Sequence, residues 1–355
     1  MSGISSNSYL PSRIKGFGKQ HSREYSREYS KELTAARPRL GWLSCVLFAV
    51  SMLCVFDTSA DTRNLLFFVS KPATDYLEVL NTVKQGLEEQ FPGQYHTTVE
   101  FISRDKSSAG EIQGEIESAD LIVTIGTAAA DTAYQYQPNV PILSALITES
   151  SFIALAGKYY GSVEQALARR VSSISIDQPT SRSARLAKLL LPAAKKVGVM
   201  LGPSAVGRQT ELTDIISAAG MQPQFVRIGA RDNPIHKIEP VLRDSDVFIP
   251  VPDSRLINLA TAKWILHLSY RHKVPVIAFS RTYLKAGALA AIYSSPENVA
   301  MQTLELIAET AESPDRAGRA YTPKYYSIHF NYSVAATLNV PLRKEKFYRQ
   351  RLGGE

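Results

Sequence analysis

Cysteine is almost absent from this sequence: its 355 residues include only two, Cys45 and Cys54. Both lie in one apolar segment near the N-terminus, so the chain beyond it has no disulfide framework and no thiol nucleophile. Neither cysteine follows a full apolar stretch with a small residue directly before it, which excludes a lipoprotein signal. A hydrophobic content of 45% is nevertheless enough to build cores in one large domain or two of ordinary size.

The excess of basic over acidic residues is also small beyond the N-terminal region. The formal net charge is +7, but residues 1–60 hold eight basic residues against four acidic ones. Residues 61–355 hold 32 basic residues against 29 acidic ones. A basic excess this small excludes nucleic acid as an expected partner of the folded part.

Recognisable catalytic and metal-binding motifs are missing. The five histidines beyond residue 60 are dispersed (His96, His236, His267, His272 and His329), and His267 and His272 do not share a helix face as i, i+4 residues would. The glycine-rich segment 202–207 continues with Arg208-Gln209 where a phosphate loop needs Lys-Ser/Thr. There is no Gly-x-Ser-x-Gly elbow. We therefore expect a protein that is not an enzyme and that uses no metal or cofactor.

The first 60 residues are typical of a leader. Residues 1–39 form a basic, low-complexity tail, and Leu40–Phe56 is uncharged and almost wholly apolar. This segment is at the lower limit for spanning a hydrocarbon core of ~30 Å, and Thr58 and Ala60 stand where a signal peptidase cleaves. Residues 40–60 are thus a signal peptide or an N-terminal anchor, which predicts a periplasmic protein, attached to the membrane only through this segment if it is not cleaved.

Beyond residue 60, short runs rich in β-formers alternate with amphipathic runs. Strands are predicted at 64–70, 97–103, 120–127, 141–148 and 172–177, with a helix at 75–91 after the first. The pattern then restarts, with strands at 195–202, 224–228, 246–252 and 274–280 separated by helices at 208–219, 233–243 and 255–272. Such alternation predicts two successive parallel sheets with right-handed crossovers.

The C-terminal part indicates that the chain recrosses between the two units. We expect an α/β protein of two doubly wound lobes joined by a hinge, with lobe I at 61–177 plus 290–320 and lobe II at 178–289 plus 321–345. In open α/β sheets ligands bind beyond the carboxyl ends of the strands. Two such sheets facing each other predict a cleft between the lobes.

Four segments resemble one known family in order and spacing over about residues 64–341. They are Asp120–Ala130 (DLIVTIGTAAA), Lys195–Pro203 (KKVGVMLGP), Val274–Ala290 with its VPVIAFS and KAGALA runs, and Asn331–Pro341 (NYSVAATLNVP). Together they are similar to the ABC-transporter substrate-binding proteins of the tryptophan/tyrosine-binding type. The resemblance implies a type I periplasmic-binding-protein fold, capture of a small solute by lobe closure, and an ABC permease as partner.

Two motifs of that family are replaced here. The Thr-Asp-Pro that such proteins carry after the fourth strand is Thr148-Glu-Ser-Ser here, and the Gly-x-Asn-x-Thr-Gly stretch is matched by Val171–Asp177 (VSSISID), without the glycines. The expected ligand is therefore a small polar organic molecule, an amino acid being one candidate among several. The alternative function is a sensor or adaptor whose partner is a membrane signalling protein.

The candidate ligand-binding residues stand at the predicted carboxyl ends of strands. Backbone N–H groups at Gly126, Thr127 and Ala128 open a helix and are suited to a carboxylate, unless Thr127 is an ordinary helix cap. Glu149 and Asp253 are suited to an ammonium group, and Tyr283 to stacking on a planar ligand, although Asp253 fits a helix cap and Tyr283 a half-core position equally. The remaining candidates supply hydroxyl groups: Ser70, Thr148, Ser204 and Ser280.

Overall fold

The computed structural model describes residues 62–102, 109–229, 231–253 and 259–353. These described residues cluster as one compact unit. The predicted tail and the apolar segment 40–56 lie outside the described residues. Among the helices that are described, none has both the length and the apolar character needed to cross a membrane.

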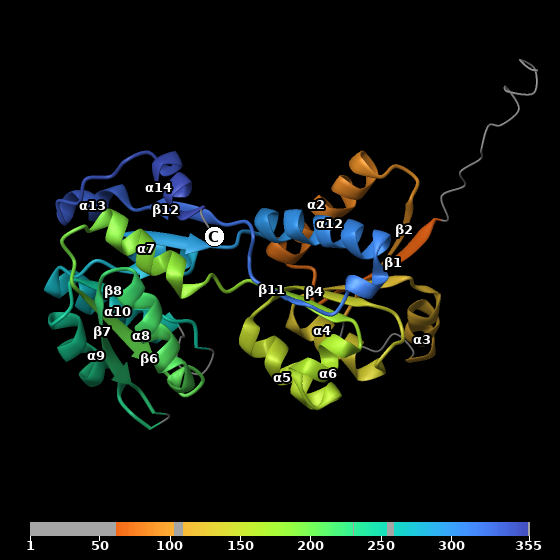
Figure 1. Cartoon of the computed structure of the whole chain (residues 1–355), viewed down its shortest axis with the longest axis horizontal. Coiled ribbons are helices and arrows are strands. Elements are labelled where there is room, and N and C mark those ends of the chain that lie inside the picture. Colours follow the sequence, from red (N-terminus) through yellow and green to blue (C-terminus); the bar gives the residue numbers. More distant parts are fainter. Residues whose placement is uncertain (1–61, 103–108, 230, 254–258, 354–355) are drawn as a thin grey trace, which may run out of the picture. The chain divides into compact units, whose positions relative to one another are not determined.

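The first lobe is built on a six-stranded, wholly parallel sheet (Figure 1). The strands lie in the order β11-β5-β4-β3-β1-β2. Their bounds are β1 (Arg63–Val69), β2 (Tyr95–Phe101), β3 (Leu121–Ile125), β4 (Ile142–Ile147), β5 (Val171–Ser175) and β11 (Ala320–Tyr321). Strands β1 and β3 are apolar along almost their whole length and are buried on both faces, as central strands of a parallel sheet must be.

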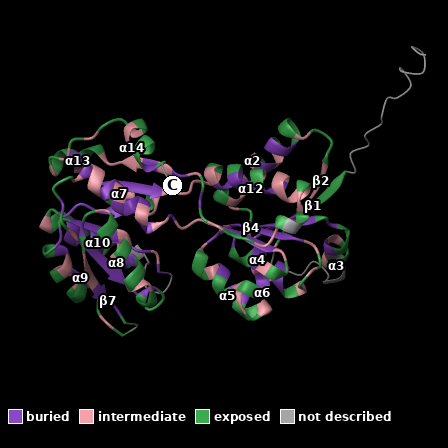
Figure 2. Cartoon of the chain, viewed as in Figure 1, coloured by how far each residue is buried: buried purple, intermediate pink, exposed green. Residues whose placement is uncertain are grey.

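Helices cover both faces of this first sheet. One face packs against α2 (Thr74–Gln90) and α12 (Pro296–Glu312), whose apolar residues recur at helical spacing. The other face packs against α3 (Ala109–Ser118), α4 (Thr127–Tyr136), α5 (Glu149–Tyr160) and α6 (Val163–Ala168). A short 3-10 turn, η2 (Pro314–Arg316), follows α12. The buried residues lie between the sheet and these helices (Figure 2).

The second lobe contains two three-stranded sheets, β7-β6-β8 and β12-β10-β9, joined by a bridge between Phe248 and Val276. Its strands are β6 (Lys196–Leu201), β7 (Gln222–Arg227), β8 (Val247–Pro250), β9 (Ile277–Ala278), β10 (Ala290–Tyr293) and β12 (Ser327–Phe330). One core includes α7 (Thr180–Leu190), α8 (Gln209–Ala218), α13 (Tyr332–Thr337) and α14 (Glu345–Leu352). The other includes α9 (Pro234–Arg243), α10 (Leu259–His272) and α11 (Arg281–Ala286). The 3-10 turn η1 (Val206–Arg208) leads into α8.

Three segments of the chain pass between the lobes, and hydrogen bonds tie them together. The Ser294 hydroxyl donates to the carbonyl of Ile176 at 3.1 Å and accepts from the Gln178 amide at 2.8 Å. Buried Arg182 donates to the Gln178 side chain and to the carbonyl of Pro323, at 2.8 and 2.6 Å. Residues from all three crossings therefore belong to one network, which forms the expected hinge.

The fold class predicted from the sequence is confirmed, but the lobe boundaries differ from those we expected. Strand β10 at 290–293 pairs with β9 and β12 and so belongs to the second lobe, whereas β11 at 320–321 pairs with β5 in the first. Strand β12 is antiparallel to β10. The reason is topological: β10 leaves the second lobe through the hinge and β12 enters it there, so these neighbours run in opposite directions.

This topology places the carboxyl ends of both sheets beside the hinge. Strand β5 ends directly before the first crossing and β10 directly before the second. Because β1, β3 and β4 run parallel to β5, and β6, β8 and β9 run parallel to β10, their carboxyl ends point the same way. Both sheets thus turn toward the crossings the edge at which open α/β sheets generally bind ligands.

Candidate functional site

The amino terminus of α4 forms the centre of the first-lobe edge. Gly126 precedes the helix with φ +95°, and a Cβ there would lie 2.4 Å from the Tyr76 ring and 2.6 Å from the Ser70 hydroxyl oxygen. The Ser70 hydroxyl, at the end of β1, accepts a hydrogen bond from the Ala129 N–H at 2.9 Å. Glycine is thus required both by the backbone conformation and by the close approach of two side chains.

Two backbone donors at this helix terminus remain available to a ligand. Thr127 and Ala128 are exposed, and within the described residues neither backbone N–H has an acceptor. The alternative that Thr127 is an ordinary helix cap does not hold. Gly126 occupies the N-cap position, and no side chain at that position caps the helix. The first turn of α4 therefore presents N–H groups with the positive end of a helix dipole.

The ends of β4 and β5 add a hydroxyl group and two carboxylates. Thr148 caps α5 by accepting from the Ser151 N–H at 3.2 Å, and the Glu149 side chain is exposed. The Glu149 N–H donates to the carboxylate of Asp177 at 2.9 Å. Burial raises the pKa of Asp177, and the negative charge of Glu149 acts in the same direction. Asp177 follows β5 and was not singled out from the sequence, although its place after a strand was a signal.

In the second lobe, Ser204 and Asp253 are joined by a hydrogen bond. The buried carboxylate of Asp253, after β8, accepts a hydrogen bond from the Ser204 N–H at 2.9 Å, after β6. Asp253 thereby fixes the turn that leads into η1. The alternative that it caps the following helix falls on residues 254–258, which lie outside the described residues.

Ser280 and Tyr283 lie at the start of α11 but have local roles. The Ser280 hydroxyl caps the helix by accepting from the Tyr283 N–H at 3.4 Å. The Tyr283 side chain is only 4% exposed and packs against Phe279 in the second lobe's core, with ring centroids 5.2 Å apart. The half-core alternative is the one observed for Tyr283, because its third position in the helix turns the ring toward the sheet.

Arg208 is a further charged residue that the sequence analysis did not select. Its guanidinium makes two hydrogen bonds of 2.9 Å to the Glu211 carboxylate. These bonds raise the pKa of Arg208, and Glu149 and Asp177 of the first lobe raise it further. Arg208 in turn opposes the rise in the pKa of Asp177. The charges at the two carboxyl edges therefore interact electrostatically. The sequence gives no sign of this interaction, because the residues are far apart along the chain.

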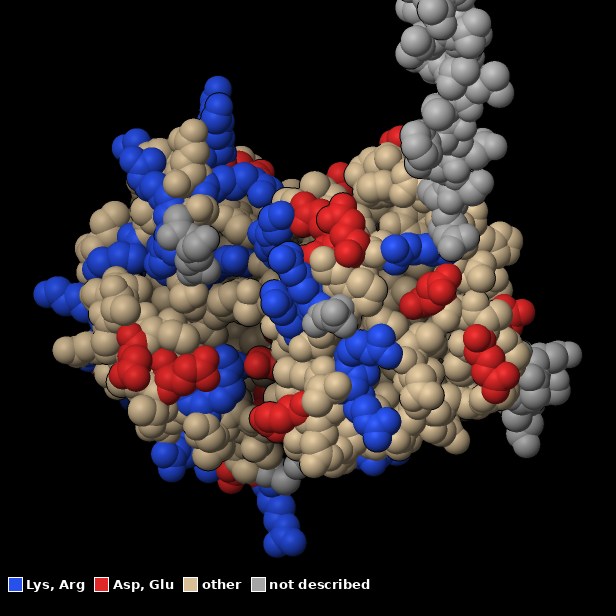
Figure 3. Space-filling view, turned by 45° about the vertical axis from the view of Figure 1, so that its right-hand side comes forward, with Lys and Arg blue, Asp and Glu red and all other residues tan. Residues whose placement is uncertain are grey.

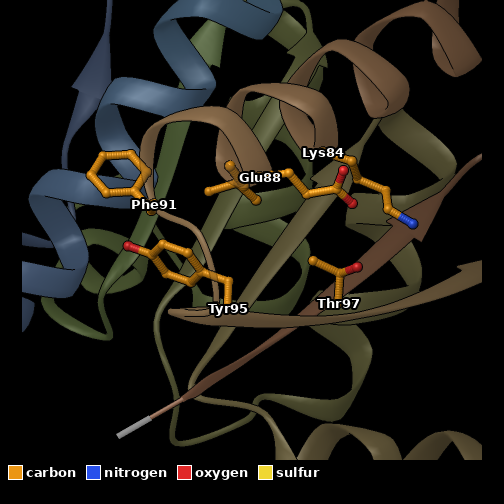
Figure 4. A pocket seen from close by; sticks show the side chains of 7 residues that line it. Lys84, Glu88, Phe91, Tyr95 and Thr97 are labelled. Carbon is orange, nitrogen blue, oxygen red and sulfur yellow. The ribbon is translucent and has the colours of Figure 1, made fainter. Parts of the chain in front are cut away.

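Two pockets lie elsewhere on the first lobe, between the C-terminal end of α2 and the start of β2. One has a volume of about 50 Å³ and is lined by Lys84, Leu87, Glu88, Phe91, Gly93, Tyr95 and Thr97 (Figure 4). The other, of about 250 Å³, shares Phe91 and Tyr95 and is bounded by the end of α12. Both are at the amino edge of the sheet, and none of the predicted ligand-binding residues lines either.

Comparison with known proteins agrees with this architecture. Residues 64–312 match the family model of the ABC transporter substrate binding proteins. A tyrosine-binding protein of Clostridioides difficile is 26% identical over 202 residues, an alignment that covers 55% of this chain and 56% of that protein. The chain thus aligns with little more than half the length of this curated relative.

Solved structures show the same fold. A ligand-free, open substrate-binding protein with adhesive properties from Clostridium difficile superposes with a TM-score of 0.62 at 17% identity, covering 80% of this chain and 97% of that one. An ABC domain in complex with L-Trp from Streptococcus pneumonia gives a TM-score of 0.50 at 14% identity, covering 81% and 97%.

Two α/β lobes joined by a three-segment hinge, with polar groups at both carboxyl edges, have the type I periplasmic-binding-protein fold. The chain belongs to the ABC transporter substrate binding protein family. The resemblance drawn from the four sequence segments is confirmed.

Proposed function

We propose that this chain is an extracytoplasmic binding protein that captures a small polar organic solute between its lobes and presents it to an ABC permease. The observation that carries the proposal is the pair of unoccupied N–H donors of Thr127 and Ala128 at the amino terminus of α4. They stand at the edge of the sheet where such folds bind ligands. The family match and the leader-like sequence of residues 1–60 support the extracytoplasmic role.

The available groups fit a zwitterion. The α4 terminus, with the Ser70 hydroxyl beside it, is suited to a carboxylate. Glu149 is exposed and makes no ion pair within the described residues, so it is our first candidate for an ammonium group. Asp253 is the second candidate, although one of its oxygens already holds the Ser204 N–H. An amino acid is thus a suitable ligand, and the relatives that bind tyrosine and L-Trp support this choice.

Thermal-shift screening of amino acids, organic acids and sugars tests the proposal. A ligand at 100 times its Kd adds about 2.7 kcal/mol to the free energy of unfolding. Thr127→Pro removes the first N–H of α4 at a helical position that tolerates proline, whereas Thr127→Ala keeps that N–H. We expect carboxylate ligands to lose affinity roughly tenfold with Thr127→Pro, which corresponds to one charge-assisted hydrogen bond. If Thr127→Pro and Glu149→Gln both bind the ligand as tightly as the wild type, the site assignment is wrong.

The permease is tested separately. A ligand-loaded protein should bind its permease more tightly than the ligand-free protein, because closure changes the surface that a partner contacts. The alternative, delivery to a membrane sensor, predicts the same dependence on ligand with a signalling protein as partner. Crosslinking in the native host, followed by identification of the partner, distinguishes the two.

A further inference from the structure

Acidic and basic residues are segregated between the two lobes. The first-lobe segments, 61–177 and 296–322, contain ten Lys and Arg against 20 Asp and Glu. The second-lobe segments, 178–295 and 323–355, contain 22 Lys and Arg against nine Asp and Glu. The small net charge of residues 61–355 therefore hides an acidic lobe and a strongly basic one.

Unpaired cations of the second lobe gather around α14. Arg343, Lys344, Lys346 and Arg351 are exposed, and within the described residues none of them forms an ion pair. The single acid of the helix, Glu345, is already paired with Arg349 at 2.6 Å. In Figure 3, blue side chains crowd the upper part of the lobe that carries α14. We call the four unpaired residues the α14 basic cluster.

Three of these four cations lie where a positive charge opposes the helix, whereas Arg351 lies in the last turn, where it is favourable. Arg343, Lys344 and Lys346 all lie within or just before the first turn of α14, at the positive end of its dipole. Acidic side chains stabilise a helix there, and basic ones oppose it. Within the described residues the Lys344 and Lys346 side chains have no ion pair to offset this cost, which is typical of residues that serve binding.

The segment that carries the cluster suits an anionic layer better than a protein. Protein interfaces need an apolar core, yet no exposed large hydrophobic residue lies among the described residues 340–353. The aromatic ring of Phe347 has the guanidinium groups of Arg343 and Arg351 at 4.4 and 3.7 Å from its centroid. The buried side of the helix, through Tyr348 and Leu352, is fixed in the core. What remains outside is a set of long cationic side chains that phosphate groups can bind.

We propose that the α14 basic cluster docks the second lobe onto an anionic phospholipid surface. From the sequence, membrane contact was expected only through residues 40–56, whose apolar length is marginal for an anchor. A weak anchor and a basic patch act together on membranes, because each adds to the same binding free energy. The acidic first lobe then faces away from the lipid.

Flotation of the full chain with vesicles tests this docking. Phosphatidylcholine vesicles are compared with vesicles that also contain phosphatidylglycerol, so that the apolar segment contributes equally to both. We expect stronger partitioning onto the anionic vesicles and its loss at high salt. Lys344→Glu combined with Lys346→Glu should lower that excess roughly tenfold or more. It should not lower the thermal midpoint, because acids suit the first turn of α14.

The matched control reverses two exposed cations of the same lobe to glutamate, Lys263 on α10 and Lys285 on α11, two helices that pack on the other core. This variant has the same net charge as the Lys344/Lys346 double variant. It should keep most of the extra partitioning onto anionic vesicles if the α14 basic cluster is the docking site. Equal partitioning of the wild type onto both vesicles would overturn the proposal, and so would equal loss in the two double variants. Solute binding is measured in parallel and is expected to be unchanged in both.

Discussion

The hydroxyl of Ser70 closes a helix that begins 57 residues later in the chain, by accepting a hydrogen bond from the N–H of Ala129 at 2.9 Å. Helix α4 has no side-chain cap of its own, because glycine stands at its N-cap. The end of β1 therefore supplies the cap that the helix lacks, and it fixes α4 against the sheet edge where we place the ligand.

Ser70→Ala should lower the free energy of unfolding by about 1 kcal/mol, the usual cost of losing a helix cap. Chemical denaturation of both proteins measures the difference. Ser217→Ala, an exposed serine within α8, is the control and should change stability by less than about 0.5 kcal/mol. A Ser70→Ala protein as stable as the wild type would show that the hydrogen bond contributes nothing net.

Gly126→Ala should destabilise the protein by about 2 kcal/mol or more. Its φ of +95° is unfavourable for alanine, and the new methyl group would lie 2.4 Å from the Tyr76 ring. Gly93 has φ +73°, and no atom lies within 4 Å of the place that a methyl group would take there, so Gly93→Ala meets only the backbone cost. The difference in denaturation midpoint between the two variants reports the steric part, and equal midpoints would contradict it.

Tyr283→Phe should leave stability unchanged or raise it. The Tyr283 hydroxyl is buried without a hydrogen-bond partner, and burial raises the pKa of Tyr283 to about 12. Removing an unsatisfied buried group removes its desolvation penalty. Tyr134→Phe, by contrast, should cost about 1 kcal/mol, because its hydroxyl lies 2.7 Å from the Ser144 hydroxyl. If Tyr283→Phe proves the more damaging of the two, the hydroxyl has a partner in solution.

Asp177→Asn should gain stability relative to the wild type as the pH rises. Burial raises the pKa of Asp177 above the ordinary value of 3.8, so the folded protein holds this proton more tightly than the unfolded chain. Its contribution to stability is thus present below pH 3.8 and is lost as the pH rises through the folded pKa. Asparagine does not titrate and can still accept from the Glu149 N–H. Thermal midpoints measured from acid to neutral pH should diverge in favour of the variant, and parallel midpoints would contradict the raised pKa.

The sequence by itself determined the local and repeating features of this protein. Buried apolar runs such as 64–70 and amphipathic runs such as 75–91 carry their periodicity in neighbouring residues, and β1 and α2 begin one residue before those predictions. The family followed from short segments in fixed order. The places of Ser70, Gly126 and Thr148 at the ends of strands were likewise visible, because a strand end is a local event.

Only the tertiary structure decided how distant segments combine. The sheet to which β10 belongs depends on pairing with β9 and β12, and the direction of β12 depends on where the hinge lies. The capping of α4 by Ser70, the burial of Tyr283 and the interaction of Arg208 with Asp177 join residues from separate elements. Side-chain contacts of this kind are set by packing in three dimensions, and no periodicity along the chain encodes them.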